Sequence, residues 1–161
     1  IYVPQKAVLF SGTIRENIAY ENEDMPMSQV ERAARIAQAD SFIEQKQEKY
    51  DDPIAQGGSN VSGGQKQRLA IARALAGDAS IYIFDDSFSA LDFKTDATLR
   101  KAIKENTKDA TVIIVAQRIN TIMDADNILV IDQGKIIGQG THDQLVKTCD
   151  VYAEIARTQM S

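Results

Sequence analysis

The 161-residue sequence predicts an α/β fold in which a parallel sheet flanked by helices is joined to an α-helical subdomain. Two observations point to this fold. The section over 13–76 has mainly helical patterning, and the section after Gly77 alternates short β-branched runs with helical stretches. Such alternation is typical of βαβ units. We expect one partial domain over 1–161, with the helical subdomain at 13–76 and the core at 77–161 together with 1–12.

Helix-start signals define the first section. Thr13–Glu16 and Ser28–Glu31 each carry a Ser or Thr followed three residues later by Glu, which is the form of a capping box. Apolar residues recur at helical spacing over 29–39, and a further helix is expected at about 40–48. The Asp-Asp-Pro run at 51–53 predicts a loop after these helices.

Short β-branched runs define the second section. Strands are expected at Ile81–Phe84, Val112–Val115 and Ile128–Ile131, with helices between them at about 94–105 and 118–124. This alternation predicts that the three strands lie in a parallel, buried sheet. The remaining expected elements are a turn at Gly134 into a strand over 135–138, a helix capped by Thr141–Gln144 and a final helix around 150–159.

Composition limits the class of protein. The apolar and charged fractions, 43% and 25%, are those of a globular domain, and no apolar run approaches the ~20 residues that cross a bilayer. The net charge of −5 and the dispersed basic residues argue against a nucleic-acid-binding surface. Cys149 is the single cysteine, which excludes a disulfide within the chain. The first residue is Ile1, within a motif, so we expect the chain to be part of a longer polypeptide.

A glycine-containing helix start stands in the middle of the chain. Ser62 is a good N-cap, and Gln65 completes a capping box. Capping does not explain Gly63 and Gly64, because each glycine costs roughly 1 kcal/mol relative to alanine inside a helix. Bare backbone N–H groups at the positive end of a helix dipole can approach an anion closely. The sequence therefore predicts a helix start at Ser62 that faces phosphate.

Two carboxylates follow an apolar strand shortly afterwards. Asp85 and Asp86 stand directly behind the expected strand Ile81–Phe84. In α/β proteins, ligands bind outside the carboxyl ends of parallel strands. A helix start that faces phosphate, followed by a strand that ends in carboxylates, is the layout of a nucleotide-hydrolysing protein.

These residues carry a resemblance to a known family, the ATP-binding cassette (ABC) proteins. The resemblance covers essentially all 161 residues, in order, and is closest to exporter-type ABC transporters. It implies the second half of a RecA-like P-loop NTPase core joined to a helical subdomain. The matching segments are Tyr2–Gln5 and Leu9–Ile18 (Q-loop region), Val61–Leu75 (signature motif), Ile81–Asp86 (Walker B strand), Ser89–Asp92 (D-loop), Ile113–Arg118 (switch loop) and Gly134–Leu145 (the tail of the domain).

The resemblance implies ATP and Mg²⁺ as cofactors and assigns roles to individual residues. A hard oxygen donor such as a carboxylate suits Mg²⁺. The implied roles are Mg²⁺ binding for Asp85 and Gln5, nucleotide contacts for Gln5, Ser62, Gly63, Gly64, Gln65 and Asp92, and catalysis for Asp86 and Gln117. In ABC dimers the signature loop of one domain closes over the nucleotide that the other domain holds.

Two residues depart from the family pattern at the catalytic centre. Asp86 stands where the family has a glutamate that acts as the general base, and aspartate is one methylene shorter. Gln117 stands where the family has histidine, and glutamine cannot carry a proton or a positive charge. A weaker departure is Gln56, near where many exporters have a glutamate. The pattern predicts a weakened site of the chain's own and an intact signature loop toward a partner.

This asymmetry leads to the expected function, an ATPase domain of an ABC exporter at the cytoplasmic face of a membrane. Its expected partners are a second ABC nucleotide-binding domain, in a heterodimer, and the transmembrane domains of the exporter; nucleic acid is not expected. Two alternatives are a non-hydrolysing ATP-binding half and a slow homodimeric ATPase. A soluble ABC ATPase acting on DNA or ribosomes fits less well, because Leu9–Ile18 has the exporter sequence.

Three other charged or titratable residues are given structural roles. Arg68 and Arg73 are expected to form ion pairs on the helix surface or with the core, although either could touch phosphate. His142, the only histidine, matches a structural position of the family at a helix start and is assigned no chemistry.

The chain by itself is expected to be inactive. No Gly-x-x-x-x-Gly-Lys-Ser/Thr motif, the loop that cradles nucleotide phosphates, occurs in the 161 residues. We therefore predict that this chain alone neither binds ATP with useful affinity nor hydrolyses it. Calorimetric titration with Mg·ATP checks this, and binding with micromolar affinity would contradict it.

Overall fold

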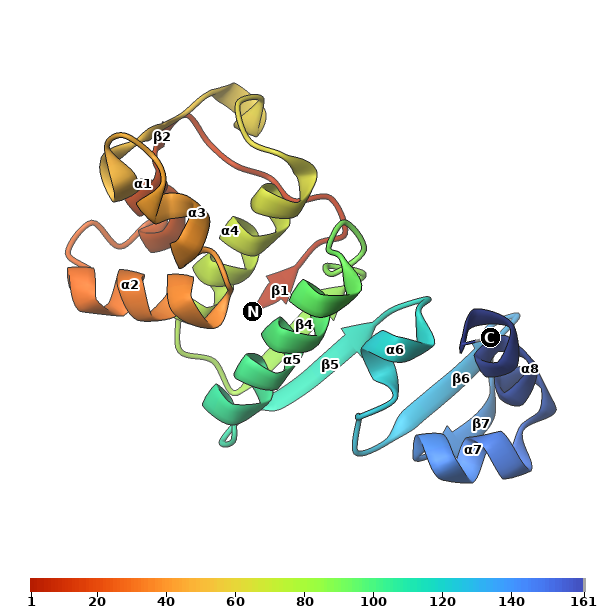
Figure 1. Cartoon of the computed structure of the whole chain (residues 1–161). Coiled ribbons are helices and arrows are strands. Elements are labelled where there is room, and N and C mark those ends of the chain that lie inside the picture. The colour runs from red at the N-terminus through yellow and green to blue at the C-terminus, as the bar shows by residue number, and fades with distance from the viewer. Residues whose placement is uncertain (161) are drawn as a thin grey trace. The chain divides into compact units, whose positions relative to one another are not determined.

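The structure is a computed structural model that describes residues 1–160. The chain divides into two compact units, Ile1–Val115 and Ala116–Ser161. Figure 1 shows the elements of each unit along the chain. The predicted boundary between residues 76 and 77 falls inside the first unit, and the predicted subdomain division stays a prediction.

A parallel sheet organises one side of the first unit (Figure 1). Its strands are β1 (Tyr2–Val3), β4 (Ile81–Asp85) and β5 (Thr111–Val115), in the order β1-β4-β5, and both neighbouring pairs are parallel. Helix α5 (Phe93–Asn106) connects β4 to β5, as the alternating pattern predicts for a βαβ unit. The expected strands at 81–84 and 112–115 are confirmed, each extended by one residue.

The rest of the first unit is mainly helical. Helix α4 packs against α1, α2 and the first strand of the sheet. The elements are β2 (Gly12–Thr13), α1 (Ile14–Ala19), α2 (Met27–Ile36), α3 (Asp40–Glu44), the 3₁₀ turns η1 (Lys49–Asp51) and η2 (Gln56–Gly58), β3 (Pro53–Ile54), which pairs antiparallel with β2, and α4 (Gly63–Ala76).

The capping predictions have different outcomes. Thr13 and Glu16 form the predicted capping box at the start of α1. The box predicted at Ser28–Glu31 is wrong, because the N-cap of α2 is Pro26, two residues before Ser28, and it has no side-chain capping bond. The carbonyl of Pro26 accepts hydrogen bonds from the backbone N–H groups of Gln29 and Val30, so Ser28 already lies in the first turn.

The sheet of the first unit is buried on one face. Tyr82 and Phe84 of β4 are buried in the core, whereas Ile81, the first residue of this strand, is half exposed. On β5, Ile113 and Val115 are 46% and 52% exposed. The expectation of a strand buried on both faces is therefore wrong for the described residues, which leave apolar side chains of this sheet exposed.

The second unit contains an antiparallel hairpin. Strands β6 (Ile128–Asp132) and β7 (Lys135–Gly140) pair antiparallel through the two-residue turn Gln133-Gly134. Both turn residues have positive φ, 48° and 76°, as a type I′ hairpin requires. The prediction that Ile128–Ile131 joins the parallel sheet is wrong for residues 1–160, because β6 forms a separate two-stranded sheet with β7 and is not hydrogen-bonded to β1, β4 or β5.

Three helices complete the second unit: α6 (Ile119–Ile122), α7 (His142–Thr148) and α8 (Asp150–Met160). Thr141 and Gln144 form the predicted capping box of α7. A small core joins these helices to the hairpin, with Leu145 and Tyr152 at its centre. In residues 1–160, no helix has both the length and the apolar character needed to cross a membrane.

Candidate functional site

Two neighbouring parallel strands bring three predicted site residues together. Because β1 and β4 pair with Val3 opposite Phe84, the residues that follow them meet at the same edge of the sheet. The side-chain amide of Gln5 donates a hydrogen bond to Oδ2 of Asp86 over 3.2 Å. Gln5, Asp86 and the adjacent Asp85 therefore form one polar cluster, and their roles stay predictions.

Tyr2 is a member of this cluster that sequence reasoning did not assign. Its hydroxyl donates a hydrogen bond to Oδ2 of Asp85 over 2.7 Å, and this bond raises the pKa of the Tyr2 hydroxyl. The bond fixes the direction of the Asp85 carboxylate. The sequence signal for this role is the position of Tyr2 on the strand that precedes Gln5. In the parallel pairing Tyr2 lies opposite Ile83, from where its long side chain reaches Asp85 at the end of the next strand.

The backbone of Asp86 is held in an unusual conformation. Its φ of 49° lies in the left-handed region, which non-glycine residues rarely adopt. The Asp86 N–H donates to the carbonyl of Val115 over 2.7 Å, so the strand pairing continues to this residue. The next residue, Ser87, is buried and its hydroxyl donates to the carbonyl of Val3 over 3.0 Å. The turn that carries Asp86 is thus fixed to both neighbouring strands.

The donor set of this cluster fits Mg²⁺ only with a nucleotide present. Within residues 1–160, no group of three or more His, Cys, Asp or Glu side chains could hold a metal ion. Mg²⁺ commonly keeps several waters and is held by one or two carboxylates together with substrate phosphates. Asp85 with the amide oxygen of Gln5 would supply the protein part of such a shell.

The second group of predicted residues lies at the start of α4. Ser62 is the N-cap, with its hydroxyl accepting from the Gln65 N–H over 3.2 Å. The side-chain carbonyl of Gln65 in turn accepts from the Ser62 N–H over 3.1 Å. The predicted capping box is confirmed. The amide nitrogen of Gln65 takes no part in the cap and can donate a hydrogen bond to an anionic ligand.

Gln67 fastens this helix start to the predicted D-loop and was missed by sequence reasoning. It is buried, donates to the Ser89 hydroxyl over 3.2 Å and accepts from the Ala90 N–H over 2.9 Å. The helical periodicity contained the signal, since Gln67 lies three and four residues before the buried Ala70 and Ile71. The structure therefore joins the start of α4 to the segment that follows β4.

The two signature glycines have different surroundings. A Cβ added at Gly64 would lie 3.2 Å from the backbone carbonyl oxygen of Ala90, which is tighter than an ordinary contact. A Cβ added at Gly63 would meet nothing closer than the Ala90 Cβ at 3.8 Å. Packing against the D-loop thus accounts for glycine at position 64, and it does not account for glycine at position 63.

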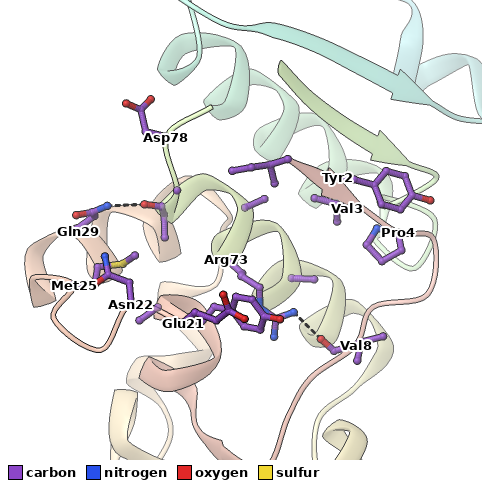
Figure 2. A pocket seen from close by; sticks show the side chains of 17 residues that line it. Tyr2, Val3, Pro4, Val8, Glu21, Asn22, Met25, Gln29, Arg73 and Asp78 are labelled. Carbon is purple, nitrogen blue, oxygen red and sulfur yellow. Dashed lines mark hydrogen bonds between the residues drawn. The ribbon is translucent and has the colours of Figure 1, made fainter. Parts of the chain in front are cut away.

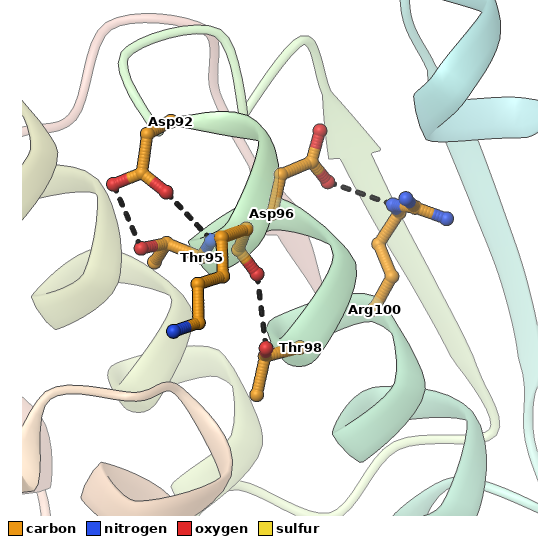
Figure 3. A network of polar contacts seen from close by, with 6 residues as sticks. Asp92, Thr95, Asp96, Thr98 and Arg100 are labelled. Atoms are coloured by element: carbon orange, nitrogen blue, oxygen red, sulfur yellow. Dashed lines mark hydrogen bonds and ion pairs between the residues drawn. The ribbon is translucent and has the colours of Figure 1, made fainter.

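Asp92, a predicted nucleotide contact, caps helix α5 (Figure 3). One carboxylate oxygen accepts from the Thr95 N–H over 2.7 Å and the other from the Thr95 hydroxyl over 2.9 Å. These bonds lower the pKa of Asp92. One turn further on, the buried Asp96 binds the guanidinium of Arg100 over 2.7 Å.

Among residues 1–160, neither signature-helix arginine has the ion pair expected for it. Arg68 donates to the carbonyls of Gly64 and Gln38 over 3.2 and 3.1 Å and lies over the ring of Phe42. Arg73 likewise donates to backbone carbonyls. The expectation was wrong because both guanidiniums are partly buried among helices, where the acceptors within reach are carbonyl oxygens.

Gln117 and His142 belong to the second unit. The side-chain amide of Gln159 donates to the Gln117 carbonyl over 2.9 Å, and its oxygen accepts from the Ile119 N–H over 2.8 Å, so α8 holds this loop in place. The Gln117 residue is exposed, and its catalytic role stays a prediction. His142 Nδ1 lies 2.7 Å from the Tyr152 hydroxyl, a contact that supports a structural role.

A hollow of about 700 Å³ opens in the first unit beside β1, α1 and α4 (Figure 2). Its wall is largely apolar, with Val3, Pro4 and Met25, and Glu21 and Asp78 also line it. None of the residues predicted to bind nucleotide or Mg²⁺ lines this hollow. The candidate site is therefore the open edge of the sheet and the start of α4 rather than this cavity.

The different surroundings of the two glycines predict opposite effects of alanine. Gly63→Ala should leave the stability unchanged or raise it by up to about 1 kcal/mol, because alanine is the better helix former and space is present. Gly64→Ala should lower it by about 1–3 kcal/mol, because the new methyl group presses on the Ala90 carbonyl. Urea unfolding of the chain measures both, and equal stabilities of the two variants would contradict the packing argument.

The cap at Asp92 predicts a pH-dependent contribution to stability. The folded pKa lies below the unfolded value of about 3.9, so the stabilisation is present above that pH and is lost as pH falls through the folded pKa. Asp92→Asn keeps a capping oxygen without the charge. The natural chain should exceed this variant in free energy of unfolding above the unfolded pKa, and the difference should shrink at lower pH. A difference independent of pH would contradict this assignment.

Comparison with known proteins identifies the family of this chain. The family model described as ABC transporter matches residues 1–89. An uncharacterized ABC transporter ATP-binding protein of Mycobacterium tuberculosis is 46% identical over 160 residues, which are 98% of this chain and 27% of that protein. The ATP-dependent lipid A-core flippase of Vibrio parahaemolyticus is 44% identical over 158 residues, again 98% of this chain and 27% of that protein.

A solved structure matches the fold along almost the whole chain. A bacterial Atm1-family ABC exporter with ATP bound has a TM-score of 0.94 and 39% sequence identity, over 99% of this chain and 28% of that one. The predicted α/β class, a parallel sheet with helices of the ABC nucleotide-binding type, is thereby confirmed. The chain spans about 27% of the length of the curated relatives above. It belongs to the ABC transporter family and represents ATP-binding-domain sequence of the exporter type.

Proposed function

We propose that this chain is part of an ATPase domain that powers transport by an ABC exporter, and that its own catalytic centre is the weaker one of a heterodimer. The proposal includes ATP and Mg²⁺ as cofactors. It includes a helical subdomain at 13–76 and a core at 77–161 with 1–12. Its support is the family membership together with the chemistry of the two residue groups described above.

The observation that carries the proposal is the cluster of Gln5, Asp85 and Asp86 at one sheet edge. When bound, Mg·ATP would supply the phosphoryl group to be hydrolysed and the positive charge of the metal ion that offsets the carboxylates. Asp85, whose carboxylate accepts the hydrogen bond of the Tyr2 hydroxyl at 2.7 Å, would present that carboxylate to the ion. Gln5 reaches the same place from the neighbouring strand, and its amide already contacts Asp86 at 3.2 Å.

Asp86 would act as the general base, and its geometry supports a reduced rate. The carboxylate is one methylene closer to the backbone than a glutamate would be, and the fixed turn around it limits compensation. A displacement of about 1 Å from the productive geometry can cost on the order of 100-fold in rate.

Gln117 would occupy the switch position of the same centre. Its amide can donate a hydrogen bond to a phosphate oxygen or to a base, and it cannot supply a positive charge. General acid–base contributions are typically worth about 100- to 10,000-fold, so replacing histidine by glutamine compounds the loss at Asp86.

The signature end of the chain keeps the features needed for a partner's nucleotide. Ser62 caps a helix of 14 residues, and the N–H groups of its first turn lie at the positive end of the dipole. Gly63 has no packing reason to be glycine, which supports close approach of an anion. The contrast between this end and the departures at Asp86 and Gln117 favours a heterodimer over a homodimer.

The proposed partners are a second ABC nucleotide-binding domain and the transmembrane domains of an exporter. The chain matches about 27% of the length of the curated relatives, and the structural relative is an ABC exporter. The proposed location is therefore the cytoplasmic face of a membrane. The chain alone, which contains no phosphate-cradling Gly-Lys loop, is proposed to be inactive.

Restoring the family residues tests the weakened site. In the complete protein without any other ABC subunit, Asp86→Glu/Gln117→His should raise the steady-state ATPase rate by about 100-fold or more, because both proposed losses are repaired. The control Asp109→Glu/Gln139→His makes the same chemical changes at exposed positions outside the proposed site and should leave the rate unchanged.

The other outcomes separate the alternatives. Ordinary activity of the natural protein would contradict the weakened site and favour a homodimeric ATPase. Little activity in both the natural protein and the double variant, with tight Mg·ATP binding in both, would favour a non-hydrolysing ATP-binding half.

A further inference from the structure

Arg73 connects helix α4 to two other segments of the first unit. Its Nε donates to the carbonyl of Asn17 over 2.8 Å, its Nη1 to the carbonyl of Val8 over 2.8 Å and its Nη2 to Oδ1 of Asn17 over 3.1 Å. Figure 2 shows the bond to Val8 beside the hollow. The guanidinium carbon also lies 5.1 Å from the ring centroid of Phe10 and 5.3 Å from that of Tyr20.

Asn17 completes this link. Its side chain is buried, accepts from the Phe10 N–H over 2.8 Å and donates to the carbonyls of Phe10 and Thr13 over 2.9 and 3.0 Å. Arg73 and Asn17 together therefore bind the extended segment Val8–Phe10 to α1 on one side and to α4 on the other. A planar guanidinium can serve several acceptors at fixed angles, which an ammonium group cannot do.

The two segments joined by Arg73 belong to different proposed sites. Val8 lies three residues after Gln5, whose amide contacts Asp86 in the chain's own site. Helix α4 is capped by Ser62 and carries the residues proposed to contact a partner's nucleotide. The Arg73 side chain thus joins the Val8–Phe10 segment to α4 directly, through hydrogen bonds and ring contacts.

We infer that Arg73 is a positioning residue that couples the Gln5 segment to α4, so that nucleotide occupancy of the chain's own site changes how Ser62–Gly64 are presented to the partner. This inference rests on the proposed function and adds the route by which the two sites communicate. Arg73 itself touches neither nucleotide site.

Arg68 provides a matched control on the same helix. It also donates to two carbonyls and lies over an aromatic ring, that of Phe42 at 4.9 Å. Its carbonyl acceptors are Gly64 and Gln38, and none of these contacts reaches Val8–Phe10. Arg→Lys at either position removes a comparable set of contacts and keeps the charge, and only the change at position 73 affects the proposed link.

The test is hydrogen–deuterium exchange of the complete protein with and without a non-hydrolysable Mg·ATP analogue. In the natural protein, the analogue should slow amide exchange over residues 5–12 and over residues 63–76. In Arg73→Lys, the slowing over 5–12 should persist and the slowing over 63–76 should fall about fivefold or more, the lower range of a typical coupling. In Arg68→Lys, both responses should persist.

Two other exchange results would overturn the coupling through Arg73. Equal slowing over 63–76 in Arg73→Lys and in the natural protein would overturn the coupling while leaving the proposed function intact. No response to the analogue in the natural protein would overturn the proposed function and the coupling with it. If Arg73→Lys does not fold, Phe10→Leu, at a residue 46% exposed, removes one ring contact and should weaken the response over 63–76 in the same direction.

Discussion

Burial of helix α4 is the constraint on which the rest of the first unit depends. Its small and branched residues, among them Leu69, Ile71 and Ala72, are buried against α1, α2 and the first strand of the sheet. Each fully buried Leu or Ile contributes roughly 1.5–3 kcal/mol relative to an exposed one. Because alanines let neighbouring helices approach, the packing fixes both the direction of the Ser62 end and the point where Arg73 leaves the helix.

The candidate site follows from this packing and from the parallel sheet. Parallel pairing places the ends of β1 and β4 side by side, so Gln5 and Asp86 meet although 81 positions separate them in the sequence. Tyr2 and Ser87 then fix the carboxylate of Asp85 and the turn of Asp86. The candidate site is thus built on strand ends whose turn is hydrogen-bonded to both neighbouring strands, and the proposed base, Asp86, lies within that turn.

The signature helix shows how one sequence motif combines packing and chemistry. Gly64 and Gln67 are explained by their contacts with Ala90 and Ser89, which hold the D-loop against α4. Gly63 has no such contact, and the capping box of Ser62 is a common helix start. What remains unexplained by packing is the bare backbone at Gly63, and this is the feature that most directly favours an anionic ligand.

The sequence by itself determined the elements whose signals are local. Neighbours along the chain determine the helix caps at Thr13, Ser62 and Thr141 and the strands at 81–84 and 112–115. The family resemblance depends on the order of the motifs. Non-local contacts were decided only by the tertiary structure. One such contact is the pairing of Ile128–Ile131 with the following strand, which depends on a turn with two positive φ values. Others are the hydrogen bonds of Tyr2 and Gln67 and most carbonyl partners of Arg68 and Arg73, which join residues far apart in the sequence. Spacing in a sequence reports which side of a helix or strand a residue occupies, whereas only packing decides which acceptor or ring faces it.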